Sequence, residues 1–447
     1  MNILLIYPGL VDGFNSYSKG SDWFNHGVGI ISAVLKKEGL HLDYLDCRKL
    51  TGWPELTAEI YSRSFELALI SVATVDFEAA QQIAGIIKEK NQNIKVMVGG
   101  SHPTLMTEQT TAIKHFDYVF THEAEITLPV VLQDISRAPR IIKGEMPQNL
   151  DTLPFVDRSI APHGETPWFP GLSRPYYSIT ASRGCLYKCS FCQPAERNVF
   201  GNTVRKRSVA SILDELAYLE KTYGMRSFMI HDDCFTQYYT WVEEFCKKKN
   251  LRMAEQTFAC QSRASIICKR PDLMKQLKDA GLRWVLIGFE SGSNRVLNYI
   301  KKETTVEQNL EAARICRELG IKIFANYMFG LPTETREEME ETVDMIRKIQ
   351  PDLYSPAVFT PAPGSELFDY CKANNLILID SSEGYRRNAF SGAKIKGVDY
   401  HFLNRMVYQS MYGKSKGMFW YGYSAIMDSF RRARRLITVK GRKYLGF

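Results

Sequence analysis

Three cysteines crowd into eight residues near the middle of the chain, at Cys185, Cys189 and Cys192. Thiolates this close together on one loop can bind three corners of an iron–sulfur cube and leave its fourth iron open to another ligand. A structural zinc site normally adds a fourth cysteine or histidine at a paired spacing, whereas the next candidates, His231 and Cys234, come about forty residues later. The spacing therefore favours a [4Fe–4S] cluster with one open iron over structural zinc.

The cysteine loop follows the first of several predicted strands that alternate with amphipathic helices. The predicted strands cover residues 177–181, 227–231, 255–261, 284–289, 321–329 and 353–359. The predicted helices cover residues 209–223, 238–249, 271–280, 306–319, 336–349 and 366–373. Six such units predict a partial (β/α)6 barrel of the TIM type, in which functional residues stand on the loops after the strands.

A similar alternation precedes the barrel. Strands are predicted over residues 2–7, 42–46, 67–72, 94–98 and 118–121, and helices over 28–37, 77–90 and 126–135. This α/β pattern predicts a Rossmann-like (flavodoxin-like) parallel sheet wrapped by helices, with ligands bound beyond the carboxyl ends of the strands. The residues at those ends include Ser71, Thr74, Gly99, Gly100 and His102.

The chain of 447 residues is long enough for several domains, and four regions are predicted. They are the parallel-sheet domain at 1–146, a proline-rich linker at 147–176, the barrel at 177–375, and a C-terminal helical region with a basic tail at 376–447. The first residues read as a strand rather than a signal peptide, and no apolar run is long enough to span a bilayer. We therefore expect a cytoplasmic protein.

The net charge of +8 is concentrated at one end of the chain. Seven basic residues fall within the last seventeen positions: Arg431, Arg432, Arg434, Arg435, Lys440, Arg442 and Lys443. Without them the net charge is +1, because 8 minus 7 leaves 1. The body of the chain thus lacks the basic footprint of a nucleic-acid-binding protein, and we expect no nucleic-acid partner.

The CxxxCxxC pattern, with the aromatic Phe191 before its last cysteine, resembles the radical S-adenosylmethionine (SAM) superfamily across the whole predicted barrel. The resemblance implies that the three cysteines hold a [4Fe–4S] cluster, that SAM chelates the open iron, and that Phe191 packs near the adenine. Four polar residues match, less specifically, positions where family members contact SAM: Asp232, Arg263, Glu290 and Ser291. Asp232 could instead cap the helix that follows it, and Glu290 could pair with a basic neighbour.

A parallel-sheet domain ahead of such a barrel resembles the cobalamin (B12)-binding members of the superfamily, the class B methyltransferases. The residues that match are Ser71, Thr74, Gly99, Gly100 and His102. A glycine pair lets a bulky planar ligand or its nucleotide tail approach the backbone, although such pairs also simply turn the chain.

Two departures from that pattern stand out in the first domain. The loop after the first strand lacks the Asp-x-His-x-x-Gly pattern that supplies a histidine to cobalt, since His26 stands at the wrong spacing from Asp22 and Gly27. A Gly-Glu-Gly-Glu segment common in relatives reads His122-Glu123-Ala124-Glu125 here. The first departure weakens the cobalt ligand, and the second tightens the loop.

The resemblance implies that the cluster cleaves SAM reductively to a 5′-deoxyadenosyl radical, for cobalamin-dependent methylation of an unactivated carbon. A cobalamin-independent or non-methylating radical SAM enzyme (a cyclase or ring rearrangement) remains an alternative. A methylthiotransferase is less favoured, because residues 1–184 contain only Cys47 where that family needs an extra cluster. A cobalamin or Fe–S sensor is the non-enzymatic alternative.

The expected partners are a small-molecule or lipid-like substrate and an electron donor such as flavodoxin or ferredoxin. The C-terminal segment mixes aromatic residues, such as Phe419 and Trp420, with the basic cluster. Such a helix could lie on an anionic membrane surface or pack its aromatic side chains on the barrel.

Overall fold

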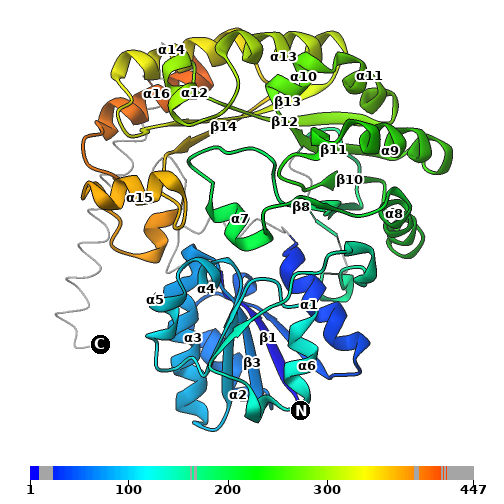
Figure 1. Ribbon diagram of the computed structural model, residues 1–447, viewed down its shortest axis with the longest axis vertical. Coiled ribbons are helices and arrows are strands. Elements are labelled where there is room, and N and C mark those ends of the chain that lie inside the picture. Colours follow the sequence, from blue (N-terminus) through cyan, green and yellow to red (C-terminus); the bar gives the residue numbers. More distant parts are fainter. Residues whose placement is uncertain are drawn as a thin grey trace.

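Two parallel sheets, one in each domain, make up the computed structural model, which describes residues 1–9, 24–161, 164–165, 169–386, 392–413, 416 and 419. Figure 1 shows the first domain in blue below the barrel, which is coloured green to yellow. The basic cluster of the C-terminal tail, and with it the expected membrane contact, lies outside the described residues. Within the described part of the chain, we find no helix with both the length and the apolar content that a bilayer crossing needs.

Sheet A, the sheet of the first domain, has six described strands, all parallel, in the order β2-β1-β3-β4-β5-β6. Their bounds are β1 Ile3–Tyr7, β2 Leu42–Asp46, β3 Leu67–Ser71, β4 Lys95–Gly99, β5 Tyr118–Thr121 and β6 Ile141–Lys143. The strand order reverses its direction between β1 and β3. In such sheets ligands bind in the crevice at this switch point.

Helices cover both faces of sheet A because its strands are apolar on both sides. Helices α2 (Trp53–Ser62) and α3 (Phe77–Lys90) share one core with the sheet. Helices α1 (His26–Lys37) and α6 (Thr127–Gln133) share the other. The short helices α4 (Ser101–Leu105) and α5 (Thr107–Thr111) follow β4.

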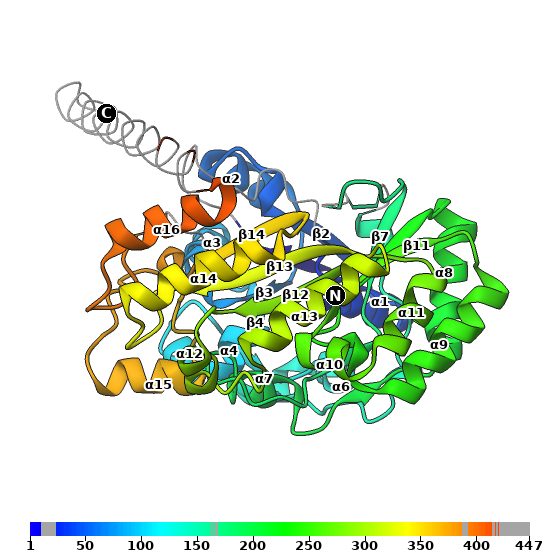
Figure 2. The same ribbon diagram turned by 90° about the horizontal axis from the view of Figure 1, so that it is seen from above.

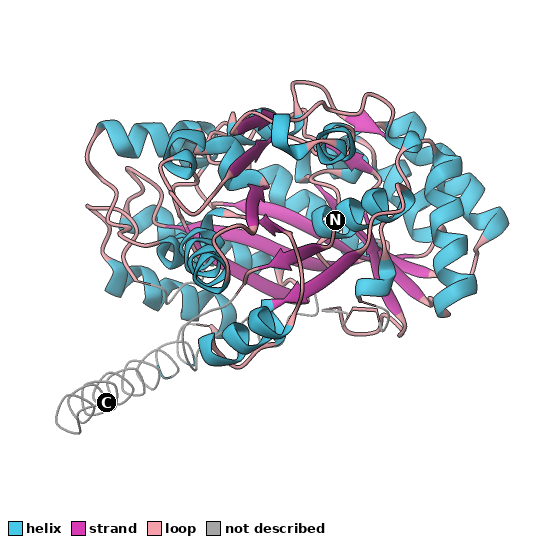
Figure 3. Cartoon of the chain, turned by 90° about the horizontal axis from the view of Figure 1, so that it is seen from below, coloured by secondary structure: helices cyan, strands magenta, loops and turns pink. Residues whose placement is uncertain are grey.

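Sheet B, the sheet of the barrel, has six described parallel strands in chain order and does not close into a ring. Their bounds are β7 Tyr176–Ile179, β10 Ser227–Ile230, β11 Thr257–Ser262, β12 Leu282–Glu290, β13 Lys322–Phe329 and β14 Leu353–Val358. A separate hairpin joins β8 (Ser182–Arg183) to β9 (Arg205–Lys206). Figures 2 and 3 show the curled sheet with helices along its outer side.

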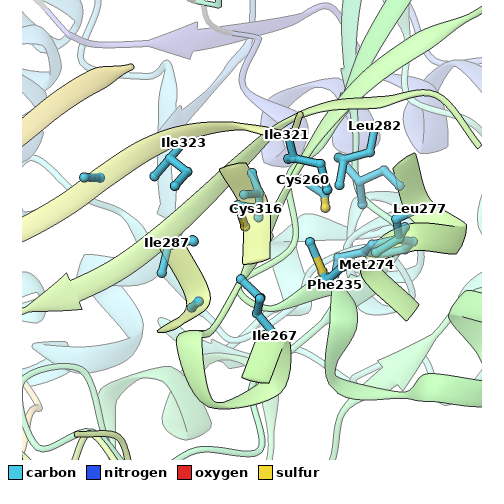
Figure 4. Close-up of a cluster of buried hydrophobic side chains, with 14 of the residues drawn as sticks. Phe235, Cys260, Ile267, Met274, Leu277, Leu282, Ile287, Cys316, Ile321 and Ile323 are labelled. Carbon is cyan, nitrogen blue, oxygen red and sulfur yellow. The ribbon is translucent and has the colours of Figure 1, made fainter. Parts of the chain in front are cut away.

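The outer helices of the barrel bury apolar faces against sheet B in one large core. They are α8 Val209–Tyr223, α9 Tyr239–Arg252, α10 Ala264–Lys269, α11 Pro271–Asp279, α13 Val306–Glu318 and α14 Arg336–Ile349. Figure 4 shows Cys260 and Cys316 among isoleucine and leucine side chains of this core. Cys260 therefore packs as an apolar residue, as free cysteines often do.

The C-terminal region packs against both domains. Its elements are α15 Glu366–Ala373, the 3-10 helix η8 Ser382–Tyr385, and α16 Tyr400–Tyr412. Helix α16 packs on α14, and η8 packs on the 3-10 helix η3 (Thr74–Asp76) of the first domain. There the Ser382 amide donates to Glu78 Oε1 at 3.0 Å, and the Glu78 amide donates to Ser382 Oγ at 3.3 Å.

The predicted α/β architecture, a Rossmann-like sheet followed by a partial barrel, is confirmed. Most predicted elements agree with the structure to within two residues, and α3, α8, α14 and α15 agree at both ends. Strand β6 and helix α2 were not predicted, nor were several short helices, which include α7 (Ala195–Phe200) and α12 (Asn294–Tyr299). Sheet A ends at Lys143 and sheet B begins at Tyr176, while the domain limits themselves stay predictions.

Candidate active site

The cysteine loop leaves β8 through Gly184, whose φ of +94° lies in the left-handed region that favours glycine. Cys189 is buried, while Cys185 and Cys192 are partly exposed. The amides of Cys192 and Gln193 both donate to the Cys189 carbonyl oxygen, at 3.1 and 2.9 Å. This tight turn places two of the three thiols on one short segment.

Backbone hydrogen bonds anchor the loop to distant parts of the barrel. The Ser190 amide donates to the carbonyl of Ile300, at the end of α12, at 3.0 Å. The Ser190 carbonyl in turn accepts from the amide of Leu367 at 3.0 Å, and the Gln193 carbonyl accepts from the amide of Glu366 at 2.8 Å. Both of these donors lie in the first turn of α15, so the loop is held against α12 on one side and α15 on the other.

The three thiols of the loop are the candidate iron ligands. Among the described residues, no three histidine, cysteine or acidic side chains lie close enough to share one metal ion. In a [4Fe–4S] cube each cysteine binds a different iron, so the thiols need not converge on one point. Burial raises the pKa of the Cys185 and Cys192 thiols, so iron binding must displace their protons.

Arg263 contacts one of the loop sulfurs. Its Nη1 lies 3.4 Å from Cys189 Sγ, and its guanidinium stacks 3.6 Å from the centre of the Tyr187 ring. Its Nη2 donates to the Lys302 carbonyl oxygen. In this structure Arg263, predicted to contact SAM, faces the cysteine loop.

Two other predicted SAM contacts are already engaged within the protein. Glu290 Oε1 accepts from Lys302 Nζ at 2.7 Å, and both side chains are buried. Glu290 thus pairs with a basic neighbour, the alternative that the sequence left open. Ser291 is fully buried, where its Oγ lies 3.2 Å from Thr342 Oγ1. Phe191 is partly buried beside an apolar cluster that includes residues of α12 and α15.

Asp232 fixes the segment that leads into the cysteine loop. Its Oδ1 accepts from the Ala181 amide at 2.7 Å, and its Oδ2 accepts from Ser182 Oγ at 2.6 Å. Its side chain therefore binds back to the preceding loop, and we find no capping bond to the helix after it in the described residues. Burial raises its pKa to about 7 despite these bonds.

We expect Asp232→Asn to change the pH dependence of folding. The folded protein holds this proton more tightly than the unfolded chain, whose carboxyl has a pKa near 3.9. Stability of the wild type relative to the variant should therefore fall as pH rises toward 7, by up to about 1.4 kcal/mol per pH unit, and stay level above it. Urea unfolding between pH 5 and 8 measures this difference.

The matched control for this prediction is Asp214→Asn, in which an exposed carboxyl on α8 is changed. Its stability difference from wild type should not vary in the same window. Parallel curves for both variants would contradict a buried, proton-holding carboxyl at position 232.

A cavity of about 650 Å³ lies between the two domains. Its lower wall is formed by the carboxyl ends of β1, β3, β4 and β5, and its upper wall by the barrel segments around Ser182 and His231. It extends between sheet A and helices α1 and α6, where its walls are apolar, as at Ile30, Met97 and Leu128. A mostly apolar cavity with polar groups at its mouth is typical of a cofactor site.

The cavity brings some of the predicted residues together and excludes others. Ser71, Gly99 and Gly100 line it from sheet A, as Asp232 does from the barrel. A Cβ at Gly100 would lie 2.8 Å from a backbone oxygen, and its φ is +112°, so only glycine fits. His102 and Thr74 are not among the lining residues. His102 Nδ1 lies 3.3 Å from Thr74 Oγ1, and the His102 imidazole packs against the Phe77 ring.

His26 also lines the cavity, at the start of α1. Its Nε2 lies 2.8 Å from Ser178 Oγ, which donates to Glu165 Oε1 at 2.7 Å. Burial and nearby arginines lower its pKa well below the ordinary value, so it is neutral at physiological pH. No local sequence pattern indicates this contact, because Ser178 lies 152 residues away.

Family models match both halves of the chain. Residues 179–346 match the radical SAM superfamily, and residues 17–132 match the B12-binding domain. The chain belongs to the radical SAM superfamily and carries a B12-binding domain ahead of its barrel, so it is an enzyme. Its cofactors are a [4Fe–4S] cluster, SAM and cobalamin.

Known proteins resemble the chain over most of its length. An uncharacterized methyltransferase of Pyrococcus horikoshii is 28% identical, over 69% of this chain and 70% of its own. An anaerobic magnesium-protoporphyrin IX monomethyl ester cyclase of Rubrivivax gelatinosus is 24% identical, over 93% and 80%. The structure of the cobalamin-dependent SAM radical enzyme OxsB with aqua-cobalamin bound is 17% identical, with a TM-score of 0.69 over 91% of this chain. The chain spans 66% of OxsB, slightly less than two thirds.

The residues present fit these cofactors. Three thiols on one anchored loop, with Arg263 beside one of them, form a donor set for a cluster with an open iron. Gly100 lines the cavity, and one buried oxygen of Glu125, which also lines it, has no hydrogen-bond partner in the described residues. An amide-rimmed macrocycle such as cobalamin can supply the missing donor.

Proposed function

We propose that the protein is a cobalamin-dependent radical SAM methyltransferase that methylates an unactivated carbon of a small molecule. The observation that carries the proposal is the cavity between the domains. It lies between the switch point of sheet A and the barrel segments around Ser182 and His231, and its lining residue Arg183 leads into the cysteine loop. A methyl donor and a substrate radical must meet in such a space, away from water.

In this proposal Cys185, Cys189 and Cys192 hold the cluster, and Asp232 and Arg263 position their loop. When bound, the cluster supplies reductive cleavage of SAM to a 5′-deoxyadenosyl radical, and the corrinoid supplies the methyl group. The protein's own contribution is orientation and exclusion of water. Phe191 bounds the cluster side of the site, and Ser71, Gly99 and Gly100 bound the corrin side.

Anaerobic purification from cobalamin-supplied cells, followed by cofactor extraction and mass spectrometry, tests the proposal. We expect near-stoichiometric cobalamin and about four irons per chain. Incubation with SAM that carries a deuterated methyl group should then label a small molecule of the cell extract. Iron without cobalamin would contradict the methyltransferase and leave a radical SAM enzyme of another reaction class.

A non-methylating reaction is the second candidate, and the likeness to a cyclase over 93% of this chain favours considering it. Such an enzyme would bind cobalamin and form 5′-deoxyadenosine without transferring the deuterated methyl group. The same labelling experiment therefore separates the two functions.

A further inference from the structure

A cluster of four charged side chains joins the two domains beside the cavity. Glu123 and Glu125 follow β5 in the first domain, while Arg183 and Arg205 lie on the β8–β9 hairpin of the barrel. Arg183 donates to Glu123 Oε2 at 2.7 Å and contacts Glu125 Oε1 at 2.8 Å. Arg205 donates to Glu123 Oε2 at 2.9 Å and also pairs with its Oε1. We call this cluster the domain bridge.

The domain bridge is buried and nearly saturated with hydrogen bonds. Both glutamates and Arg205 are each 7% exposed. Arg205 also donates to the carbonyls of Pro147, at 2.8 Å, and Phe200, at 3.1 Å. Buried ion pairs are costly to desolvate and add little net stability, and in some proteins they specify a particular arrangement of the groups that they join. The arrangement is therefore better suited to holding a position than to stabilising the fold.

Each end of the domain bridge is tied to one cofactor site. Arg183 stands two residues before Cys185, on the strand that leads into the cysteine loop. Glu123 and Glu125 line the cavity, and the second oxygen of Glu125 is buried without a partner. A Cβ at Gly144 would lie 1.9 Å from the Glu123 carbonyl oxygen, so the edge of sheet A holds this loop closely.

We propose that the domain bridge is the positioning element that sets the separation between the corrin in the cavity and the cluster on the cysteine loop. This inference rests on the proposed function. The four side chains of the domain bridge connect the β5–α6 loop to Arg183 and Gly184, the two residues before Cys185. Methyl and radical transfer need reacting groups within about an ångström of the correct separation, so a rigid contact at this point has a direct use.

The test is a comparison of two substitutions that remove one charge each: Glu123→Gln, which keeps the side-chain size, and Arg183→Met, which keeps an unbranched but shorter side chain. Both are prepared with cob(II)alamin and a reduced cluster, and the magnetic interaction between the two centres is measured by electron paramagnetic resonance. We expect wild type to show a defined broadening of the cob(II)alamin signal by the reduced cluster. Both variants should lose that defined broadening while their iron and cobalamin contents stay unchanged.

The control is Arg252→Met, which removes an exposed ion pair with Asp214 on the outer helices and should behave as wild type. Arg183→Lys keeps a positive charge with fewer donors and should retain part of the broadening, which covers the case in which Arg183→Met does not fold. Unchanged broadening in both test variants, with both cofactors bound, would overturn the inference. Absence of a cob(II)alamin signal in wild type would instead overturn the proposed function.

Discussion

Replacement of Cys189 by alanine is expected to abolish SAM cleavage. Cys189 is the most buried of the three cysteines, and its carbonyl closes the turn that also positions Cys192. Alanine keeps that turn but removes one of three iron ligands. We expect the rate of 5′-deoxyadenosine formation to fall by at least about a thousandfold, or roughly 4 kcal/mol of transition-state stabilisation. Chromatography of the nucleoside after anaerobic incubation with dithionite measures it.

The control for this substitution is Cys268→Ser on α10, outside the cysteine loop. Cys268 Sγ lies 3.3 Å from the Gln308 carbonyl, and a serine hydroxyl can make the same bond. This variant should retain both iron content and SAM cleavage. A Cys189→Ala protein with four irons and wild-type cleavage would refute the assignment of the cysteine loop as the cluster site.

Replacement of Ser71 by tryptophan is expected to prevent cobalamin binding without affecting the cluster. Ser71 ends β3 beside the switch point and lines the cavity. An indole there would occupy space that a corrin or its nucleotide tail needs. We expect cobalamin affinity to fall at least about a hundredfold, or roughly 2.7 kcal/mol, with iron content and cluster spectrum unchanged. Absorption spectra after desalting of the reconstituted protein measure the bound corrinoid.

Ser136→Trp provides the matched control, because Ser136 is exposed in the 3-10 helix η4 (Ile135–Arg137) of the same domain. It adds the same indole far from the switch point and should leave cobalamin binding intact. Wild-type cobalamin content in Ser71→Trp would show that the corrin does not occupy the cavity.

Local sequence patterns were enough to predict the elements that position the site. The 3.6-residue apolar period of α8 and α14, and the continuous apolar runs of β1 and β3, are properties of consecutive residues. They also determine which end of each strand carries functional loops. Strand β6 was not predicted because only Ile142 of its three residues is buried, which leaves no run for a pattern to detect.

Contacts between distant side chains could not be predicted in the same way. The sequence placed Glu290 and Asp232 at strand ends, but it gave no means of choosing between SAM and an internal partner. Their observed partners, Lys302 and Ser182, depend on how loops fold over the barrel mouth. The contact between the His102 and Phe77 rings is of the same kind, and a role of His102 beside the cofactor stays a prediction.

The return of η8 to η3 has a consequence for the integrity of the molecule. Ser382 and Glu78 are 304 residues apart, so their hydrogen bonds join the C-terminal region to the first domain in addition to the linker and the domain bridge. A protease cut in the linker would therefore leave two fragments that remain bound to each other. The nicked protein should elute as one species under native conditions and separate only in denaturant, because non-covalent contacts hold its two fragments together.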